Sequence, residues 1–251
     1  MPLFTVVIPA YNSEKYIEES VHSARRQTIG DIEIIIVCDP CGDSTETIAE
    51  ELAKQDPRIT VIRNTERLGV AESRNIGMTE AGGEYIAFLD ADDVWLEDKL
   101  SRQYELLTQT GSDICYSSYS FVDASGREVG NPFVIKGSID YKGLLYGNVI
   151  GTSACVVSKE IAGKHRMDGS YYNEDYVFWL SLLKAGHTAC GVTDVLVNYR
   201  LSPGSRSRDK LLLTKHRWDT YRKFLSMNIF ASTWYTAIGS LRAAKKYRGA
   251  R

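Results

Sequence analysis

The sequence lacks the short motifs that several common enzyme classes need. Its 251 residues hold no Gly-x-Gly-x-x-Gly dinucleotide turn, no Gly-x4-Gly-Lys-Ser/Thr phosphate loop, no Gly-x-Ser-x-Gly elbow and no His-Glu-x-x-His pair. Each motif places a backbone or side-chain group where one particular chemistry requires it. Dehydrogenase, P-loop kinase, serine hydrolase and zincin functions therefore lose support, although a nucleotide could still bind through other loops.

Cysteine and histidine are scarce and mostly unpatterned. There are five cysteines, an odd number, and four histidines that form no motif. Cys38 and Cys41 form a Cys-x-x-Cys pair after an apolar run, which admits a redox pair or half of a zinc site. No second cysteine pair or His-x-His cluster completes a zinc site, and no signal peptide precedes the first apolar run. We therefore expect a cytoplasmic, reducing compartment.

Charge is unevenly distributed along the chain. The composition, 43% hydrophobic and 25% charged, is typical of a soluble globular protein with room for one large α/β domain. Residues 209–251 carry 10 Lys and Arg against 2 Asp and Glu, a net charge of +8, which leaves −10 for residues 1–208. This split predicts an acidic main domain over residues 1–208 and a basic extension over residues 209–251 that can meet an anionic surface.

Strand and helix patterns alternate through the first ninety residues. Four buried strands are predicted by apolar runs at residues 3–8, 32–38, 59–63 and 85–89. Three helices are predicted between them: one capped by Asn12 or Ser13, one opened by a capping box of Asp43 and Glu46, and one over residues 70–81. This alternation predicts a right-handed parallel sheet.

The second half predicts a less regular arrangement. We expect an amphipathic helix from residue 97 to about 107, strands at residues 114–119 and 152–158, an apolar helix after Glu174 and an edge strand at residues 195–199.

The strand predicted at residues 85–89 ends abruptly in three carboxylates, those of Asp90, Asp92 and Asp93. Carboxylates that cluster beside a dry core repel one another unless a cation lies among them, and open α/β sheets bind ligands at the carboxyl ends of their strands. Oxygen ligands of this kind favour Mn2+ or Mg2+ carrying a diphosphate. For the three acids taken alone, a solvated acidic turn is the alternative.

Four blocks of the sequence together resemble a known family. They are residues 6–12 (VVIPAYN), 36–39 (IVCD), 71–77 (AESRNIG) and 85–93 (YIAFLDADD). Their order and spacing resemble the family 2 glycosyltransferases of the GT-A fold, and the resemblance runs from residue 5 to about residue 207. It implies an α/β, Rossmann-like fold with a mostly parallel central sheet flanked by helices. A nucleotide-binding half (1–110) and an acceptor-binding half (111–208) would precede a C-terminal helical appendage.

The resemblance also implies a site for a nucleotide-sugar donor. Pro9, Ala10 and Tyr11 would contact the base or ribose, and the Asp39 carboxylate would accept from the imide N–H of uracil. Among the remaining candidates, Arg74 would support the diphosphate or the acidic motif, Asp90 would contact the ribose or support the metal, and Arg206 would belong to a lid over the diphosphate.

The same resemblance implies an inverting reaction. Asp175 would act as the general base that removes the acceptor hydroxyl proton, and Glu174 would orient that base or the acceptor. Asp92 would bind Mn2+ or Mg2+, which neutralises charge on the leaving diphosphate. The alternative for Glu174 and Asp175 is that they merely suit the positive N-terminus of a helix.

An uncharged stretch at residues 224–241 is flanked by Lys and Arg. One apolar stripe at helical spacing runs through it, formed by Met227, Phe230, Ala231, Trp234, Ile238 and Leu241. Its other face is too polar for a membrane span, so we expect either a helix at a membrane interface or a helix packed on the protein's own core.

Together with these patterns, the resemblance implies an inverting, metal-dependent hexosyltransferase of cell-surface polysaccharide assembly. A nucleotide-sugar donor, most simply a UDP-sugar, would meet a saccharide acceptor that a polyprenyl diphosphate could carry, at the inner face of the plasma membrane. A sugar nucleotidyltransferase is one alternative, although residues 9–12 are not the glycine-rich basic loop expected of that class. A catalytically inactive nucleotide-binding module is the other.

Overall fold

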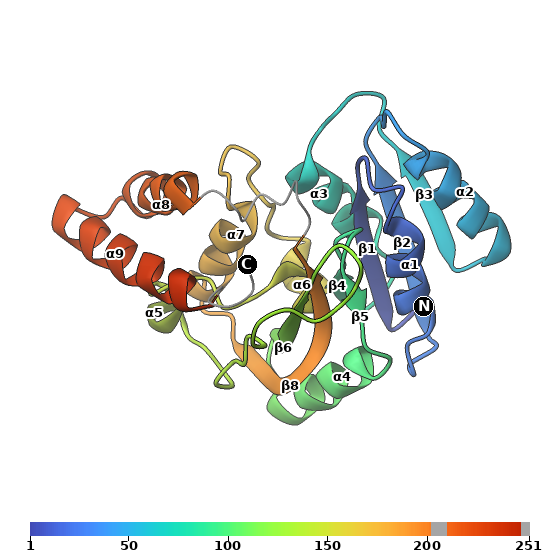
Figure 1. Ribbon diagram of the computed structural model, residues 1–251. Helices are drawn as coiled ribbons and strands as arrows, with labels where there is room; N and C mark the ends of the chain where they lie inside the picture. Colours follow the sequence, from blue (N-terminus) through green and yellow to red (C-terminus); the bar gives the residue numbers. More distant parts are fainter. Residues whose placement is uncertain (202–209, 247–251) are drawn as a thin grey trace.

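One eight-stranded sheet organises the molecule, and helices cover both of its faces (Figure 1). The computed structural model describes residues 1–201 and 210–246. The sheet has the strand order β3-β2-β1-β4-β7-β6-β8-β5, and its strands lie between Phe4 and Arg200. This α/β arrangement confirms the predicted fold class.

The first half of the chain forms the predicted parallel unit. Its strands are β1 (Phe4–Ala10), β2 (Ile32–Cys38), β3 (Ile59–Arg63) and β4 (Tyr85–Phe88), and its helices are α1 (Ile17–Arg25), α2 (Thr45–Gln55) and α3 (Val70–Glu80). β1 pairs in parallel with β2 on one side and with β4 on the other, and β3 extends the sheet beyond β2. The strand order reverses between β1 and β4, and ligands of open α/β sheets bind at such a reversal.

The second half adds strands of mixed direction. It contains β5 (Val94–Trp95), α4 (Lys99–Thr110), β6 (Ile114–Val122), α5 (Tyr141–Leu144), η1 (Thr152–Ala154), β7 (Cys155–Ser158), α6 (Lys159–Ala162), α7 (Glu174–Lys184) and β8 (Ala189–Arg200). β7 runs antiparallel to both β4 and β6, whereas β8 is parallel to β6. The strand predicted at residues 195–199 is present as part of β8, but its predicted place at the sheet edge is wrong, because the two-residue β5 pairs with β8 and covers its outer side.

Two helix starts also differ from the prediction. α1 begins at Ile17 without a side-chain cap, because the Asn12 side chain instead accepts from the backbone N–H of Gly42 at 2.9 Å. Asp43 accepts from the backbone N–H of Thr45 at 3.0 Å, but Glu46 turns away to Arg63 at 2.8 Å, so no capping box forms. In both cases a contact with another segment takes the side chain away from its own helix.

Close packing holds α3 against the sheet. Gly77 lies so near β1 that a Cβ atom on it would stand 2.3 Å from Cγ1 of Val7. A Cβ atom on Gly83, just before β4, would stand 2.6 Å from the backbone nitrogen of Thr5. Only glycine leaves room for these approaches, which fix the turn from α3 into β4.

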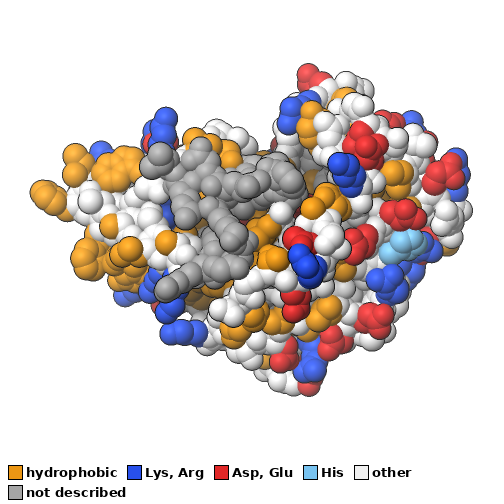
Figure 2. Space-filling view, viewed as in Figure 1, with side chains coloured by type: hydrophobic (Ala, Val, Ile, Leu, Met, Phe, Trp, Pro, Cys, Tyr) orange, Lys and Arg blue, Asp and Glu red, His pale blue; other side chains and the backbone are white. Residues whose placement is uncertain are grey.

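The chain ends in helices that lie beyond α7, far from β3 (Figure 1). They are α8 (Lys210–Asp219), the π-helical turn η3 (Thr220–Phe224) and α9 (Ile229–Lys246). The fully buried Tyr221 anchors this region, because its hydroxyl donates to the carbonyl of Leu145 at 2.7 Å and lies 3.1 Å from the hydroxyl of Tyr176. Acidic side chains gather at the opposite end of the molecule, over the first strands (Figure 2). Within the described residues, every helix is too short or too polar to cross a bilayer.

Candidate active site

Asp93, the last of the three acids after β4, anchors the acidic turn. Asp93 is buried, and its carboxylate accepts from the Ser153 hydroxyl at 2.5 Å and from the backbone N–H of Arg200 at 2.9 Å. Burial raises the pKa of this carboxyl well above its usual value, and the neighbouring Asp92 and Asp90 raise it further. Asp93 is therefore a structural acid, which leaves Asp90 and Asp92 nearer the surface of the turn.

Arg200 is a second anchor of this turn, and sequence reasoning gave it no role. Its Nε donates to the carbonyl of Asp92 at 2.8 Å, and its Nη2 donates to Glu19 of α1 at 2.6 Å. The guanidinium also lies over the ring of Tyr16, 4.6 Å from its centroid. One buried cation thus joins the end of β8 to the acidic turn and to α1.

Arg74 joins the two halves of the site. It lies on α3 with a side chain that is 4% exposed, and its guanidinium donates to Asp90 at 2.6 Å and to Glu174 at 3.0 Å. Burial by itself would lower the pKa of this group, but the two carboxylates more than offset burial and raise it. A permanently charged Arg74 is therefore the centre of a carboxylate–guanidinium–carboxylate bridge. Arg74 thus contacts the acidic motif, and its role in supporting the donor diphosphate stays a prediction.

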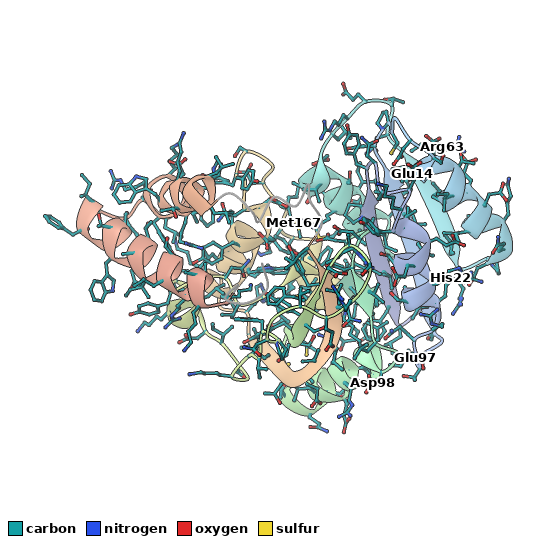
Figure 3. The ribbon with its side chains drawn as sticks, viewed as in Figure 1. Glu14, His22, Arg63, Glu97, Asp98 and Met167 are labelled. Atoms are coloured by element: carbon teal, nitrogen blue, oxygen red, sulfur yellow. The ribbon has the colours of Figure 1, made fainter. Side chains whose placement is uncertain are left out.

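The next residue on α3 fixes the loop that leads to α7. The Asn75 side chain donates to the carbonyl of Met167 at 2.9 Å and accepts from the backbone N–H of Met167 at 2.8 Å. Met167 lies in the middle of the molecule beside α3 (Figure 3). Arg166 adds an ion pair with Glu72 at 2.7 Å. Consecutive residues of α3 therefore hold both Glu174 and the segment before it.

Asp175 faces a large cavity at the start of α7. Its carboxylate accepts from the Asn148 amide at 2.9 Å and from the Thr152 hydroxyl at 3.3 Å. The cavity measures about 1090 Å³, and its acidic wall consists of Asp90, Glu174 and Asp175. Asp175 is thus half-buried, accepts hydrogen bonds from Asn148 and Thr152, and lines the cavity.

Another part of the cavity wall is basic and aromatic. The C-terminal helices contribute Arg217, Arg242, Lys245 and Lys246, four cations that were not predicted as site residues. The Lys246 ammonium lies 4.5 Å from the ring centroid of Phe133. Burial lowers the pKa of Lys246 to about 8, and the charge of Asp175 opposes that shift. α9 thus takes part in the cavity that Asp175 faces.

The predicted nucleotide residues Pro9, Ala10, Tyr11 and Asp39 lie together at the carboxyl ends of β1 and β2. The backbone N–H of Asp39 donates to the carbonyl of Ala10 at 3.1 Å, which makes the two strand ends neighbours. None of these four residues is among those that line the cavity, so the site has two adjoining parts. The bridge through Arg74 and Asp90 lies between them.

Asp39 also shapes the loop that follows β3. Its buried carboxylate accepts from the Asn64 amide at 2.9 Å and from the backbone N–H groups of Leu68 and Gly69 at 3.2 and 2.8 Å. This loop brings Arg67 over the ring of Tyr11, 4.0 Å from its centroid. A carboxylate offers about four acceptor positions, so Asp39 retains capacity for one further donor.

The Cys38 and Cys41 pair lies at this edge, at the end of β2. The Cys41 thiol donates to the carbonyl of Asp39 at 3.0 Å, and both Cys38 and Cys41 are free thiols. Arg206, the predicted lid residue, lies outside the described residues.

The acidic turn fits a metal that the substrate helps to bind. Asp92 is half-exposed, and one Asp90 oxygen is already engaged by Arg74. Across residues 1–201 and 210–246, no three His, Cys, Asp or Glu side chains stand close enough to hold a metal between them. Mg2+ and Mn2+ commonly use only one or two carboxylates together with substrate phosphates. The donor set of the turn is compatible with such a shared site.

Comparison with known proteins gives the class of this fold. TarS of S. aureus, in complex with UDP-GlcNAc, matches with a TM-score of 0.74 at 18% identity, over 98% of this chain and 73% of that one. The mannosyltransferase PcManGT from Pyrobaculum calidifontis, in complex with GDP-Man and Mn2+, matches with a TM-score of 0.71 at 18% identity, over 100% and 76% of the chains. These likenesses show the GT-A glycosyltransferase fold.

Sequence comparison then gives the family. A model described as glycosyl transferase family 2 matches residues 5–160, more than half of the chain. TuaG of Bacillus subtilis (strain 168), named provisionally as a teichuronic acid biosynthesis glycosyltransferase, is 34% identical over 98% of this chain and 97% of its own length. WfgD of Escherichia coli, named as a UDP-Glc:alpha-D-GlcNAc-diphosphoundecaprenol beta-1,3-glucosyltransferase, is 29% identical over 98% and 97%. The chain belongs to glycosyl transferase family 2 and is a glycosyltransferase.

Proposed function

We propose that the protein is an inverting, metal-dependent hexosyltransferase that moves a sugar from a UDP-sugar to a saccharide carried on a polyprenyl diphosphate. The observation that carries the proposal is the bridge from Asp90 through Arg74 to Glu174. It ties the acidic turn, where the donor diphosphate would lie, to the start of α7. Asp175 therefore faces the cavity immediately beside the point where the transferred sugar would lie.

In the proposed reaction, Asp175 removes the proton from the acceptor hydroxyl as that oxygen attacks the anomeric carbon. The bond to UDP breaks on the opposite face of the sugar, so the anomeric configuration inverts. The Asn148 and Thr152 donors keep the Asp175 carboxylate oriented toward the cavity. Asp92, with Asp90 beside it, would hold Mn2+ or Mg2+, which when bound neutralises charge on the departing diphosphate.

The chemistry of the two parts of the site and the name of one relative support a UDP-sugar donor and a lipid-linked acceptor. Asp39 is an acceptor beside Tyr11, which suits a base edge that presents an N–H group, as uracil does. The cationic wall of the cavity suits an acceptor that carries phosphate. WfgD is named for a UDP-Glc donor and a diphosphoundecaprenol-linked acceptor. An acceptor of that kind would place the enzyme at the membrane surface.

Calorimetric titration with UDP, GDP, CDP and TDP, each with and without Mn2+ or Mg2+, tests the donor site. We expect tightest binding of UDP with metal, and Asp92→Ala should weaken that binding at least about tenfold, a loss of roughly 1.4 kcal/mol. Glu97→Gln is the matched control, because this exposed carboxylate follows the same turn but lies away from the site (Figure 3). Absence of binding by every nucleotide under every metal condition would refute the donor assignment.

Turnover of Asp175→Asn tests the proposed base. With a donor and acceptor that the wild type uses, this variant should lose about a hundredfold or more in kcat, the usual contribution of a general base. Its affinity for UDP should stay within about twofold, because the residue lies outside the nucleotide part of the site. Equal kcat in Asp175→Asn and the wild type would show that Asp175 is not the base.

A further inference from the structure

The outward face of α9 is strongly apolar. Ile229 is 59% exposed, Phe230 86%, Trp234 60% and Leu241 72%. The i, i+4, i+11 spacing of Phe230, Trp234 and Leu241 puts these three side chains along one side of the helix, opposite Ser232 and Gly239, and we call this side the outer face of α9. In Figure 2 hydrophobic side chains gather at the end of the molecule that α9 forms. Scattered single apolar residues need no explanation, but a row of large ones marks a contact surface.

The inner face of the same helix is built from small and polar residues. Ser232, Thr236 and Gly239 are buried. A Cβ atom on Gly239 would stand 2.9 Å from Cδ of Arg217 on α8, and the Arg217 guanidinium donates to the Ser240 hydroxyl at 2.9 Å. α9 therefore packs on the protein with its small side chains inward and its largest apolar side chains outward. Of the two expected arrangements, packing on the protein's own core therefore holds for the small-residue face of α9, whereas Phe230, Trp234 and Leu241 of the apolar stripe are exposed.

We propose that the outer face of α9 docks on the surface of an anionic phospholipid bilayer. Residues 220–246 contain Arg222, Lys223, Arg242, Lys245 and Lys246 but no Asp or Glu. These cations lie at both ends of an uncharged apolar segment that includes an exposed tryptophan. An amphipathic helix of this composition lies in the plane of the interface, with its apolar side among the acyl chains and its cations near anionic headgroups.

The charge pattern favours lipid over a second copy of the chain. Two copies that met through this face in antiparallel orientation would bring Lys223 of one copy toward Arg242 and Lys245 of the other. Parallel pairing would oppose identical cations instead. Asp219 pairs with Lys223 at 3.2 Å, but residues 220–246 supply no carboxylate for Arg242 and Lys245, whereas anionic headgroups supply negative charge along the helix.

Docking of α9 on a bilayer would also explain how a lipid-linked acceptor reaches the active site, and this part of the inference rests on the proposed function. Arg242, Lys245 and Lys246 of α9 also line the cavity that Asp175 faces. A helix that lies on the bilayer would therefore form one wall of the cavity at the level of the headgroups. A saccharide joined to a membrane lipid through a diphosphate could reach Asp175 while its lipid stays in the bilayer, and its phosphates would meet the cationic wall.

Sedimentation of the full-length protein with sucrose-loaded vesicles tests the proposal. We expect binding to phosphatidylcholine vesicles that contain phosphatidylglycerol, and weaker binding to phosphatidylcholine alone. The double variant Phe230→Ser/Trp234→Ser should lose at least about tenfold in affinity for the anionic vesicles, because both rings leave the apolar face. Lys223→Gln should lose about fivefold, the equivalent of roughly 1 kcal/mol for one cation. Leu96→Ser, an exposed apolar change elsewhere, should bind as the wild type does.

Tryptophan fluorescence with brominated lipids shows whether α9 itself enters the interface. Quenching should occur in the wild type and fall sharply in Trp234→Phe. Vesicle binding equal to wild type in the Phe230/Trp234 double variant would overturn the proposal, as would failure of the wild type to bind anionic vesicles. Light scattering that shows a dimer in the wild type and a monomer in the double variant would assign the face to a second copy instead.

UDP titration of the same preparations separates this inference from the proposed function. Vesicle binding without any nucleotide binding would refute only the proposed donor site. UDP binding without vesicle binding would refute only the proposed docking of α9.

Discussion

Replacing Arg74 should destabilise the protein mainly by leaving a buried charge without its partner. In Arg74→Met, Glu174 keeps a side chain that is only 6% exposed but loses the guanidinium 3.0 Å away. Asp90, with 29% of its side chain exposed, can instead recover hydration. Breaking a buried ion pair by removing one partner typically costs about 3–5 kcal/mol. For a protein of this size, that corresponds to a fall in Tm of roughly 6–20 °C.

The double variant Arg74→Met/Glu174→Gln distinguishes this cause from lost packing. If loss of the guanidinium beside the buried Glu174 carboxylate is responsible, the neutral amide introduced by Glu174→Gln should recover part of the stability, and the double variant should be more stable than Arg74→Met alone. Arg74→Lys should fall between the wild type and Arg74→Met, because one ammonium keeps the charge but cannot reproduce the fork that reaches both acids.

Thermal unfolding followed by circular dichroism measures the Tm of each protein. The experiment is done near neutral pH with EDTA and without nucleotide, so that ligand binding does not contribute to the Tm. The wild type and all three variants are compared under identical conditions. A double variant as unstable as Arg74→Met, or a change of less than about 2 °C in Arg74→Met itself, would refute the charge argument.

Two further substitutions have expected effects on stability. Burial lowers the pKa of Lys99 to about 7, and its ammonium lies 3.7 Å from the ring centroid of Trp95 with no hydrogen-bond partner among the described residues. An unfolded lysine has a pKa near 10.4, so between about pH 7 and pH 10 the unfolded chain binds more protons than the folded one, and wild-type stability should rise with pH over that range. Lys99→Met should be more stable than the wild type near neutral pH and should lack this rise. Curves of Tm against pH that run parallel for the two proteins would contradict the prediction. Gly77→Ala should cost about 1–3 kcal/mol by crowding Val7, and Val7→Ala should restore part of that loss, whereas Gly30→Ala, whose Cβ meets nothing within 4 Å, should change Tm little.

The parallel half of the fold and the acidic ends of its strands were predictable from local patterns. Apolar runs of strand length, with helical spacing between them, placed β1 to β4 and α1 to α3 within a few residues of their observed bounds. Asp39, Asp90 and Asp92 follow those strands directly, so a shared carboxyl edge required only that the strands be parallel. The roles of these residues in binding and catalysis stay predictions that the proposed experiments address.

The helix caps, the place of β8 and the partners of Arg74 depended on contacts across the chain. Asn12 bonds to Gly42 and Glu46 pairs with Arg63, contacts that no pattern within one helix can reveal. Likewise, a two-residue β5 is too short for a periodicity, yet it is enough to cover β8.

The sequence by itself determined which residues are apolar, which are charged and how they recur along each helix and strand. Only the tertiary structure decided which of these faces meet. Arg74 lies 100 positions from Glu174 in the chain but 3.0 Å from it in space. Phe230, Trp234 and Leu241 of the apolar stripe prove to point away from the protein. Local periodicity shows which face of a helix is apolar, whereas the face that becomes buried depends on how all the elements pack together. In α9, small residues such as Ser232 and Gly239 let the helix approach α8 more closely than its aromatic side could.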